Sequence, residues 1–133
     1  LPEFVPVPED NSGFPIAFLT PNAANRIHSQ FGNLEIIKKV TDAPAAEISP
    51  ADAEKRQIRS GNKIRIYNEQ GESITTARVS KRVPEGVIIL PNGIWLSEGG
   101  GGNILVQPSE TDIGYGAAFH DTMVEFENYT ENA

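Results

Sequence analysis

The sequence of 133 residues contains no cysteine and only two histidines, one tryptophan and one methionine. The absence of cysteine excludes disulfides, iron–sulfur ligation, thiolate zinc sites and a cysteine nucleophile from this chain. The two histidines, His28 and His120, do not have the spacing of a metal-binding pair on one helix, and no serine lies in a G-x-S-x-G motif. We therefore expect no hydrolytic or metal catalysis by this chain alone.

Long apolar runs and basic stretches are also missing. No apolar segment approaches the ~20 residues of a membrane helix, and no stretch interleaves basic with aromatic residues, so we expect neither membrane insertion nor nucleic-acid binding. The net charge is −7, but six of the 18 acidic residues lie in residues 1–12 and 125–133, which contain no base. The other 12 acidic residues nearly balance the 11 basic ones, so the body of the chain can accept an anionic ligand.

The chain has room for one domain with one core. Residues 1–13 contain three prolines and no periodic pattern, which predicts an extended linker from upstream domains. We expect the folded domain over residues 14–127 and a disordered tail over residues 128–133.

Short apolar or alternating segments fill the predicted domain. They predict strands over residues 15–20, 46–48, 63–67, 73–80, 87–90, 104–106 and 122–126, with a hairpin turn over 68–71. A short helix is expected over 33–39 with Asn33 as its cap. A second helix is expected after Ser49, with Pro50 at its first position. This order predicts a mainly β protein that forms a closed or nearly closed barrel.

Polar side chains are concentrated in residues 20–30, directly after the first expected strand. This segment holds amide, hydroxyl, guanidinium and imidazole groups and no acid. Ligand-binding loops are common at such strand ends. Arg26 can form a forked contact to a phosphate, while Thr20, Asn22 and Ser29 can bond a heterocycle. An ordinary polar loop has the same composition, so both interpretations stand on the residues alone.

The loop over residues 91–102 ends in four glycines, Gly99 to Gly102. Glycines allow backbone N–H groups to approach a pyrophosphate, but we interpret this run as a flexible connector. Asn103 follows the loop, and its amide can donate to and accept from a heterocycle. Trp95 can cover a ring system or close the barrel end, and core packing is the favoured interpretation.

A third polar loop follows at residues 111–116. The carboxylate of Asp112 matches the two adjacent donors on the Watson–Crick edge of guanine, and an Asx turn is the alternative. His120 precedes Asp121, and we expect an exposed contact between these two side chains.

Three segments together resemble one known family. They are FLTPNAANRIHSQFGN (18–33), ISPADAEKRQIRSGNKIRIYNEQGE (48–72) and GGNILVQPSETDIGYGAAFHD (101–121). In this order they are similar to the C-terminal molybdopterin-dinucleotide-binding domain of the dimethyl sulfoxide reductase family of molybdenum oxidoreductases. The resemblance covers residues 14–127, and its middle segment is the most specific.

The resemblance implies a double-psi β-barrel in which Asp52 starts a helix and binds no ligand. It also implies a set of cofactor contacts in the three polar loops. These are Thr20, Asn22, Arg26, His28, Ser29, Gln30, Trp95, Asn103 and, less directly, Asp112. Pro21-Asn22 differs from the Gly-Arg of formate dehydrogenases and disfavours that subgroup. The R-x-H-S-Q-F run (26–31) and the D-I-G-x-G-A-A-F-H-D tail (112–121) favour the dimethyl sulfoxide, thiosulfate or polysulfide reductase branches.

The resemblance further implies that the chain is part of a larger enzyme of anaerobic respiration and is inactive as a fragment. The implied cofactor is bis(molybdopterin guanine dinucleotide) with molybdenum or tungsten, shared with upstream domains of the same polypeptide. Any iron–sulfur cluster would lie elsewhere in the parent protein or in an electron-transfer subunit. The alternative is a stand-alone, non-catalytic double-psi barrel that serves as a scaffold or protein-interaction subunit.

Overall fold

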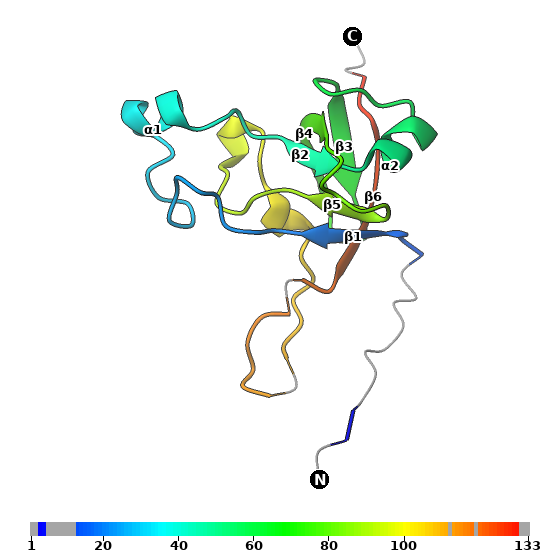
Figure 1. Cartoon of the computed structure of the whole chain (residues 1–133). Coiled ribbons are helices and arrows are strands. Elements are labelled where there is room, and N and C mark those ends of the chain that lie inside the picture. Colours follow the sequence, from blue (N-terminus) through cyan, green and yellow to red (C-terminus); the bar gives the residue numbers. More distant parts are fainter. Residues whose placement is uncertain (1–2, 5–12, 112, 119, 131–133) are drawn as a thin grey trace.

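The computed structural model describes residues 3–4, 13–111, 113–118 and 120–130. Most of the predicted linker and the last three residues of the predicted tail lie outside the described residues. The described strands close into one barrel (Figure 1), which confirms the predicted mainly β fold. They are β1 (Ile16–Leu19), β2 (Ala46–Ile48), β3 (Lys63–Tyr67), β4 (Glu72–Val79), β5 (Val87–Ile89) and β6 (Thr122–Asn128).

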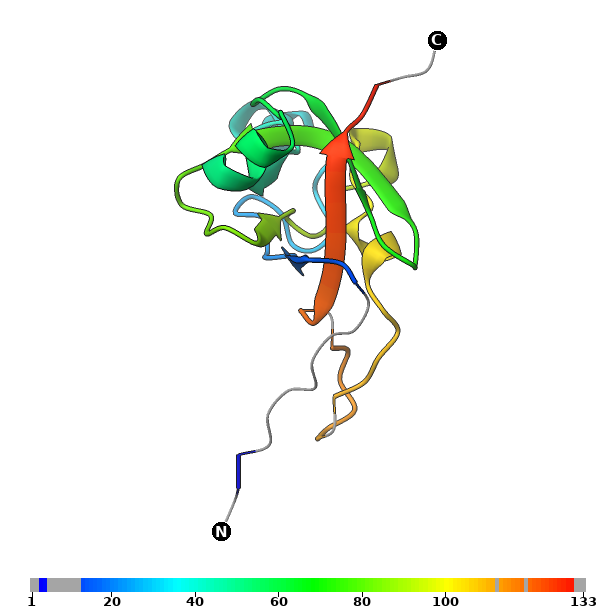
Figure 2. The same ribbon diagram turned by 90° about the vertical axis from the view of Figure 1, so that its right-hand side faces the viewer.

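The strands follow the order β1-β5-β2-β4-β3-β6 around the barrel. The pairs β1–β5 and β2–β4 are parallel, and the remaining neighbours are antiparallel. Figure 2 views this ring from the end that carries helix α2 (Pro50–Lys55). The architecture is that of a double-psi β-barrel, as the sequence resemblance implies.

Buried and partly exposed side chains alternate along the strands, and the buried ones form the core. Ile64 and Ile66 of β3, Phe18 of β1 and Phe126 of β6 point inward and are almost fully buried. Each such side chain stabilises the fold by about 1.5–3 kcal/mol through the removal of apolar surface from water. Leu105, from the short 3-10 helix η2 (Gly102–Leu105), is also fully buried and joins this core.

Helix α2 begins as its sequence predicts. The hydroxyl oxygen of Ser49 accepts a hydrogen bond from the backbone N–H of Asp52 at 3.0 Å, and Pro50 occupies the first helical position. The buried carboxylate of Asp52 accepts the Ser49 hydroxyl at 2.7 Å and the backbone N–H of Gly86 at 2.8 Å. Asp52 therefore joins the helix start to the turn before β5, which is a structural role.

Two local predictions are wrong. Helix α1 (Glu35–Val40) is capped at Leu34, whose carbonyl accepts the N–H groups of Ile37 and Lys38, and not at Asn33. Ile104 and Leu105 lie in η2 and not in a strand. The backbone of Gly101 has φ +119°, which starts a tight turn, and the turn buries Leu105 while Ile104 stays exposed.

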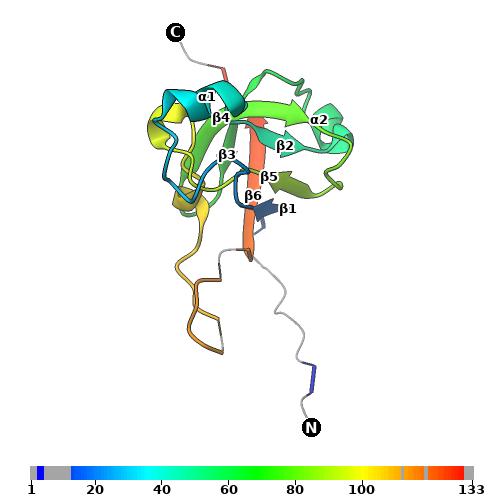
Figure 3. The ribbon, with the colours of Figure 1, turned by 60° about the vertical axis from the view of Figure 1, so that its left-hand side comes forward.

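The two ends of the barrel differ. Helix α1 and the short 3-10 helix η1 (Leu96–Glu98) lie toward the end where β1 and β5 finish, and α2 lies at the other end (Figures 1 and 3). The segment 106–121, which we call the arm, extends away from the barrel, and its residues 112 and 119 are outside the described residues. Each described helix is too short to cross a membrane.

Candidate functional site

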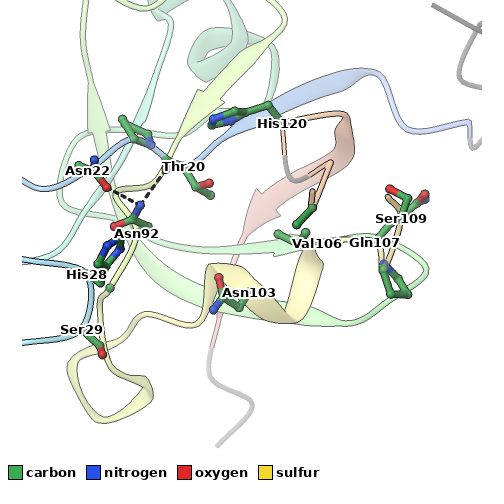
Figure 4. Close-up of a pocket in the computed structure, with 14 residues that line it drawn as sticks. Thr20, Asn22, His28, Ser29, Asn92, Asn103, Val106, Gln107, Ser109 and His120 are labelled. Atoms are coloured by element: carbon green, nitrogen blue, oxygen red, sulfur yellow. Dashed lines mark hydrogen bonds between the residues drawn. The ribbon is translucent and has the colours of Figure 1, made fainter. Parts of the chain in front are cut away.

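A cavity of about 800 Å³ lies where the loops after β1 and β5 meet the arm. Figure 4 shows the two loops on one side of it, the arm on the other and Asn103 between them. Its lining residues are Thr20, Pro21, Asn22, His28, Ser29, Asn92, Gly93, Asn103, Val106, Gln107, Pro108, Ser109, Ala117 and His120.

The first wall comes from residues 20–32, which we call loop A. Thr20 directly continues β1 and is buried, which fixes the beginning of the loop at the barrel end. Further along, the backbone N–H of Gln30 bonds to the carbonyl of Ile27 at 2.9 Å in a tight turn. His28 adopts a left-handed φ of +52° within that turn, so His28 and Ser29 lie at its tip beside the cavity.

The second wall comes from residues 91–103, which we call loop B. The side-chain amide of Asn92 donates to Asn22 Oδ1 at 2.9 Å and to the carbonyl of Thr20 at 3.4 Å (Figure 4). Asn92 Oδ1 is buried and has no hydrogen-bond partner in the described part of the chain. Asn92 therefore ties loop B to loop A at the cavity wall.

The glycine run in loop B is closely packed at Gly100 and Gly101, and its role as a flexible connector stays a prediction. Gly100 is buried, and a Cβ atom there would lie 2.3 Å from Cγ2 of Ile94. The run leads into η2, which is fixed by the buried Leu105 and by the amide of Asn68. That amide donates to the carbonyl of Leu105 at 2.7 Å. Asn103 is thereby held at the rim of the barrel.

The arm supplies the third wall. Its two halves pair through a bridge between Glu110 and Ala117, with the N–H of Ala118 bonded to the carbonyl of Ser109 at 3.0 Å. This pairing places residues 106–109 and His120 at the cavity. His120 is exposed, as expected, and its predicted contact with Asp121 stays a prediction.

Five of the nine residues proposed from the sequence line this one cavity, namely Thr20, Asn22, His28, Ser29 and Asn103. Gln30 is exposed and lies outside the cavity lining. Asp112 lies outside the described residues. Trp95 is 41% exposed, so the prediction of core packing is wrong, and its indole N–H donates to the carbonyl of Ser29 at 2.8 Å.

Arg26 lies behind the cavity wall. Its two terminal nitrogens donate to the two carboxylate oxygens of Glu98 at 2.7 and 2.8 Å. The hydrogen bonds from Arg26 hold the pKa of Glu98 below its ordinary value, against the opposing effect of burial. The forked contact expected for Arg26 is therefore made to a carboxylate of loop B.

The cavity has a consistent chemical character. Its described lining carries amides, hydroxyls and two imidazoles but no carboxylate, so an anionic ligand meets no repulsion from the wall. Within the described residues, no group of three or more histidine, aspartate or glutamate side chains is placed to hold a metal ion. The arrangement suits a large polar organic ligand held by hydrogen bonds.

Sequence reasoning missed Asn92, Gly93 and residues 107–109. Asn92 lies three residues after the end of β5, as Asn22 lies three residues after the end of β1, and parallel neighbours end at the same side of a barrel. That parallel pairing, had it been predicted, would have identified Asn92. The sequence carries no comparable signal for residues 107–109, because their position depends on how the arm folds back.

Comparison with known proteins agrees with this geometry. The chain is 31% identical to the dimethyl sulfoxide reductase DmsA of Escherichia coli over 88% of its own length and 15% of that protein. It is 32% identical to a trimethylamine-N-oxide reductase of Haemophilus influenzae over 66% of its length and 12% of that protein. The structure of acetylene hydratase from Pelobacter acetylenicus shares the fold, with a TM-score of 0.74 and 16% identity over 87% of this chain and 18% of that one.

The chain thus spans less than a fifth of the length of these relatives. A family model, the "Molydopterin dinucleotide binding domain", matches residues 16–123, which include all three walls of the cavity. The chain therefore belongs to the molybdopterin dinucleotide-binding domain family.

Proposed function

We propose that the cavity between loop A, loop B and the arm is where this chain binds a molybdopterin guanine dinucleotide and orients it for a larger oxidoreductase. The observation that carries the proposal is the convergence of Thr20, Asn22, Ser29 and Asn103 on one uncharged cavity of about 800 Å³. This volume is within the ~300–1,000 Å³ that organic ligands occupy in proteins.

The side chains fit such a ligand. A pterin edge carries donors and acceptors next to each other, and the amides of Asn22 and Asn103 offer both functions. The amide of Asn92 supports this arrangement because it donates to Asn22 Oδ1 at 2.9 Å. Ser29 and the histidines His28 and His120 can donate to phosphate oxygens.

The finer identity of the cofactor is also part of the proposal. We assign the guanine form, present as two molecules on one molybdenum or tungsten atom, and we keep Asp112 as the contact to the guanine edge. The bound metal cofactor would supply the redox or oxygen-atom chemistry. This chain would contribute binding and orientation only, and any iron–sulfur cluster would lie in other parts of the parent protein or in its electron-transfer subunit.

The parent activity follows from the relatives. Two of them are named as reductases of dimethyl sulfoxide and of trimethylamine-N-oxide. We infer that the parent of this chain is a terminal reductase of the same kind, used in anaerobic respiration, in which upstream domains of the same polypeptide complete the cofactor site.

Replacement of Asn103 by alanine in the parent enzyme tests the proposal. We expect molybdenum and pterin content per protein to fall by about tenfold, the effect of losing two hydrogen bonds of ordinary strength. Asn128→Ala is the matched control, since the Asn128 amide bonds to the carbonyl of Gln57 and not to the cavity. Release of guanosine monophosphate on acid hydrolysis would identify the guanine form.

A parent enzyme that contains neither molybdenum nor tungsten would overturn the proposal and favour a scaffold role. Equal metal content in Asn103→Ala and Asn128→Ala would remove Asn103 from the site.

A further inference from the structure

Loops A and B are joined by a compact set of contacts behind the cavity wall. The guanidinium of Arg26 and the carboxylate of Glu98 form two hydrogen bonds of 2.7 and 2.8 Å across 72 residues of sequence. A second connection runs from the indole N–H of Trp95 to the carbonyl of Ser29 at 2.8 Å. We call these four residues the loop latch.

The guanidinium of Arg26 is enclosed. Its side chain is 6% exposed, one nitrogen also approaches the carbonyl of Gly93 at 3.4 Å, and Arg26 is not among the residues that line the 800 Å³ cavity. Gly32 packs against it so closely that a Cβ atom there would lie 2.4 Å from Nη1. A rotation of this side chain toward a ligand would leave Glu98 as a largely buried, unpaired carboxylate, which is unfavourable.

The carboxylate of Glu98 likewise makes its hydrogen bonds within the latch. It accepts the backbone N–H of Trp95 at 3.1 Å in addition to the two bonds from Arg26, and its side chain is 22% exposed. Charge-assisted, bidentate pairs of this kind are the strongest and most directional hydrogen bonds available between side chains. The latch therefore fixes the first turn of η1 relative to loop A.

The latch has a direct geometric consequence for the ligand-facing residues. Ser29 belongs to the latch and also lines the cavity, and His28 precedes it in loop A. In loop B, the lining residues Asn92 and Gly93 lie shortly before Trp95 in the sequence. Separation of the two loops would move Asn92 away from Asn22, with which it shares a 2.9 Å hydrogen bond. Sites that hold a ligand through several hydrogen bonds tolerate only small displacements of this kind.

We propose that Arg26 is a positioning residue that acts through Glu98, setting the separation of loops A and B, and that it is not a phosphate ligand. The inference rests on the proposed function, because the separation matters through the cofactor that the two loops hold. It replaces the direct phosphate contact that the sequence suggests for Arg26.

A charge swap in the parent enzyme distinguishes the two roles. We expect Arg26→Glu and Glu98→Arg each to lower molybdopterin and molybdenum content by about tenfold, and the double swap to recover most of it. A phosphate ligand at position 26 would show no recovery in the double variant, because a carboxylate would then face the phosphate. Loss of recovery in a folded double variant would overturn the proposal.

Glu98→Gln gives a second measurement that does not require the protein to fold with the two charges exchanged. It preserves the shape of the side chain and removes the charge, so we expect a clear loss of cofactor together with a modest loss of stability at neutral pH. Full cofactor content in Glu98→Gln would overturn the proposal. If the role were purely structural, cofactor content would follow stability, and the more destabilised Asp52→Ala would lose at least as much cofactor as Glu98→Gln.

The ion pair of Arg65 with Glu72, 2.6 Å apart on β3 and β4, provides the matched control. Arg65→Glu removes this more exposed pair and the pair of Arg65 with Glu127, and none of these residues lines the cavity, so cofactor content should stay at the wild-type level. If the wild-type parent holds no cofactor, the proposed function fails. If the wild type is loaded and Glu98→Gln is equally loaded, the inference about Arg26 fails alone.

Discussion

The carbonyl oxygen of His28 lies 1.9 Å from the point where a Cβ atom at Gly93 would stand. Gly93 also has a left-handed φ of +74°, which side-chain-bearing residues adopt at a cost. Loop B can therefore approach the tip of loop A only because position 93 has no side chain. This close approach and the loop latch join the same two loops.

We predict that Gly93→Ala separates the two loops. The left-handed backbone should lower the free energy of unfolding by about 1–2 kcal/mol, and the clash with His28 should add about 1–3 kcal/mol. Denaturant unfolding measures the loss of stability. The molybdenum content of the parent enzyme shows whether the cavity still holds the cofactor.

Gly86→Ala is the control for this prediction. Gly86 has a similar φ of +80°, but a Cβ atom there would meet no atom within 4 Å. It should show the backbone cost of about 1–2 kcal/mol without loss of cofactor. Equal cofactor loss in both variants would contradict the role assigned to the Gly93–His28 contact.

Asp52→Ala should destabilise the barrel without direct effect on the cavity. Asp52 is 2% exposed, and its removal leaves the Ser49 hydroxyl and the Gly86 N–H without their acceptor. We expect a loss of about 3 kcal/mol in denaturant unfolding, as is typical for breaking a buried hydrogen-bonded group. Asp42→Ala, whose side chain is 83% exposed, should cost less than about 0.5 kcal/mol.

The latch should be sensitive to acid. The hydrogen bonds from Arg26 lower the pKa of folded Glu98 below its ordinary value of 4.5, so its charged form stabilises the fold at neutral pH. This contribution should be fully present above pH 4.5 and should disappear as the pH falls through the lowered folded pKa. Wild type should therefore exceed Glu98→Gln in stability at neutral pH and converge with it in acid.

A double-mutant cycle checks the origin of that pH dependence. In a background that carries Arg26→Gln, the stability difference between glutamate and glutamine at position 98 should lose most of its pH dependence. A difference that keeps the same pH profile without Arg26 would mean that another group lowers the pKa of Glu98.

The chain alone should turn over no substrate. Its cavity residues can bind and orient a ligand, and its described residues offer no cluster for a metal ion. An assay with a reduced dye and an S-oxide or N-oxide acceptor should give no activity for the chain and clear activity for the parent enzyme. Activity of the purified chain that Asn103→Ala abolishes would contradict this prediction.

Much of the fold was predictable because it depends on neighbouring residues. Alternation in β3 and the sequence Ser49-Pro50 before α2 reflect backbone geometry and capping, which act over a few residues. The prediction failed at residues 104–106, where three apolar residues match a strand equally well. The burial of Leu105 at the barrel end favours a 3-10 turn there.

The candidate site divides in the same way. The polar composition of residues 20–30 and the amide of Asn103 are visible in the chain, and the resemblance relates them to one cofactor. The partner of Arg26 cannot be identified from the sequence. Glu98 lies 72 residues away, and nothing in the local sequence distinguishes it from the other acidic residues of the chain. Closure of the barrel brings β1 and β5 side by side and so joins the loops that follow them. Long-range pairs of this kind depend on loop packing, and packing has no signature in local sequence.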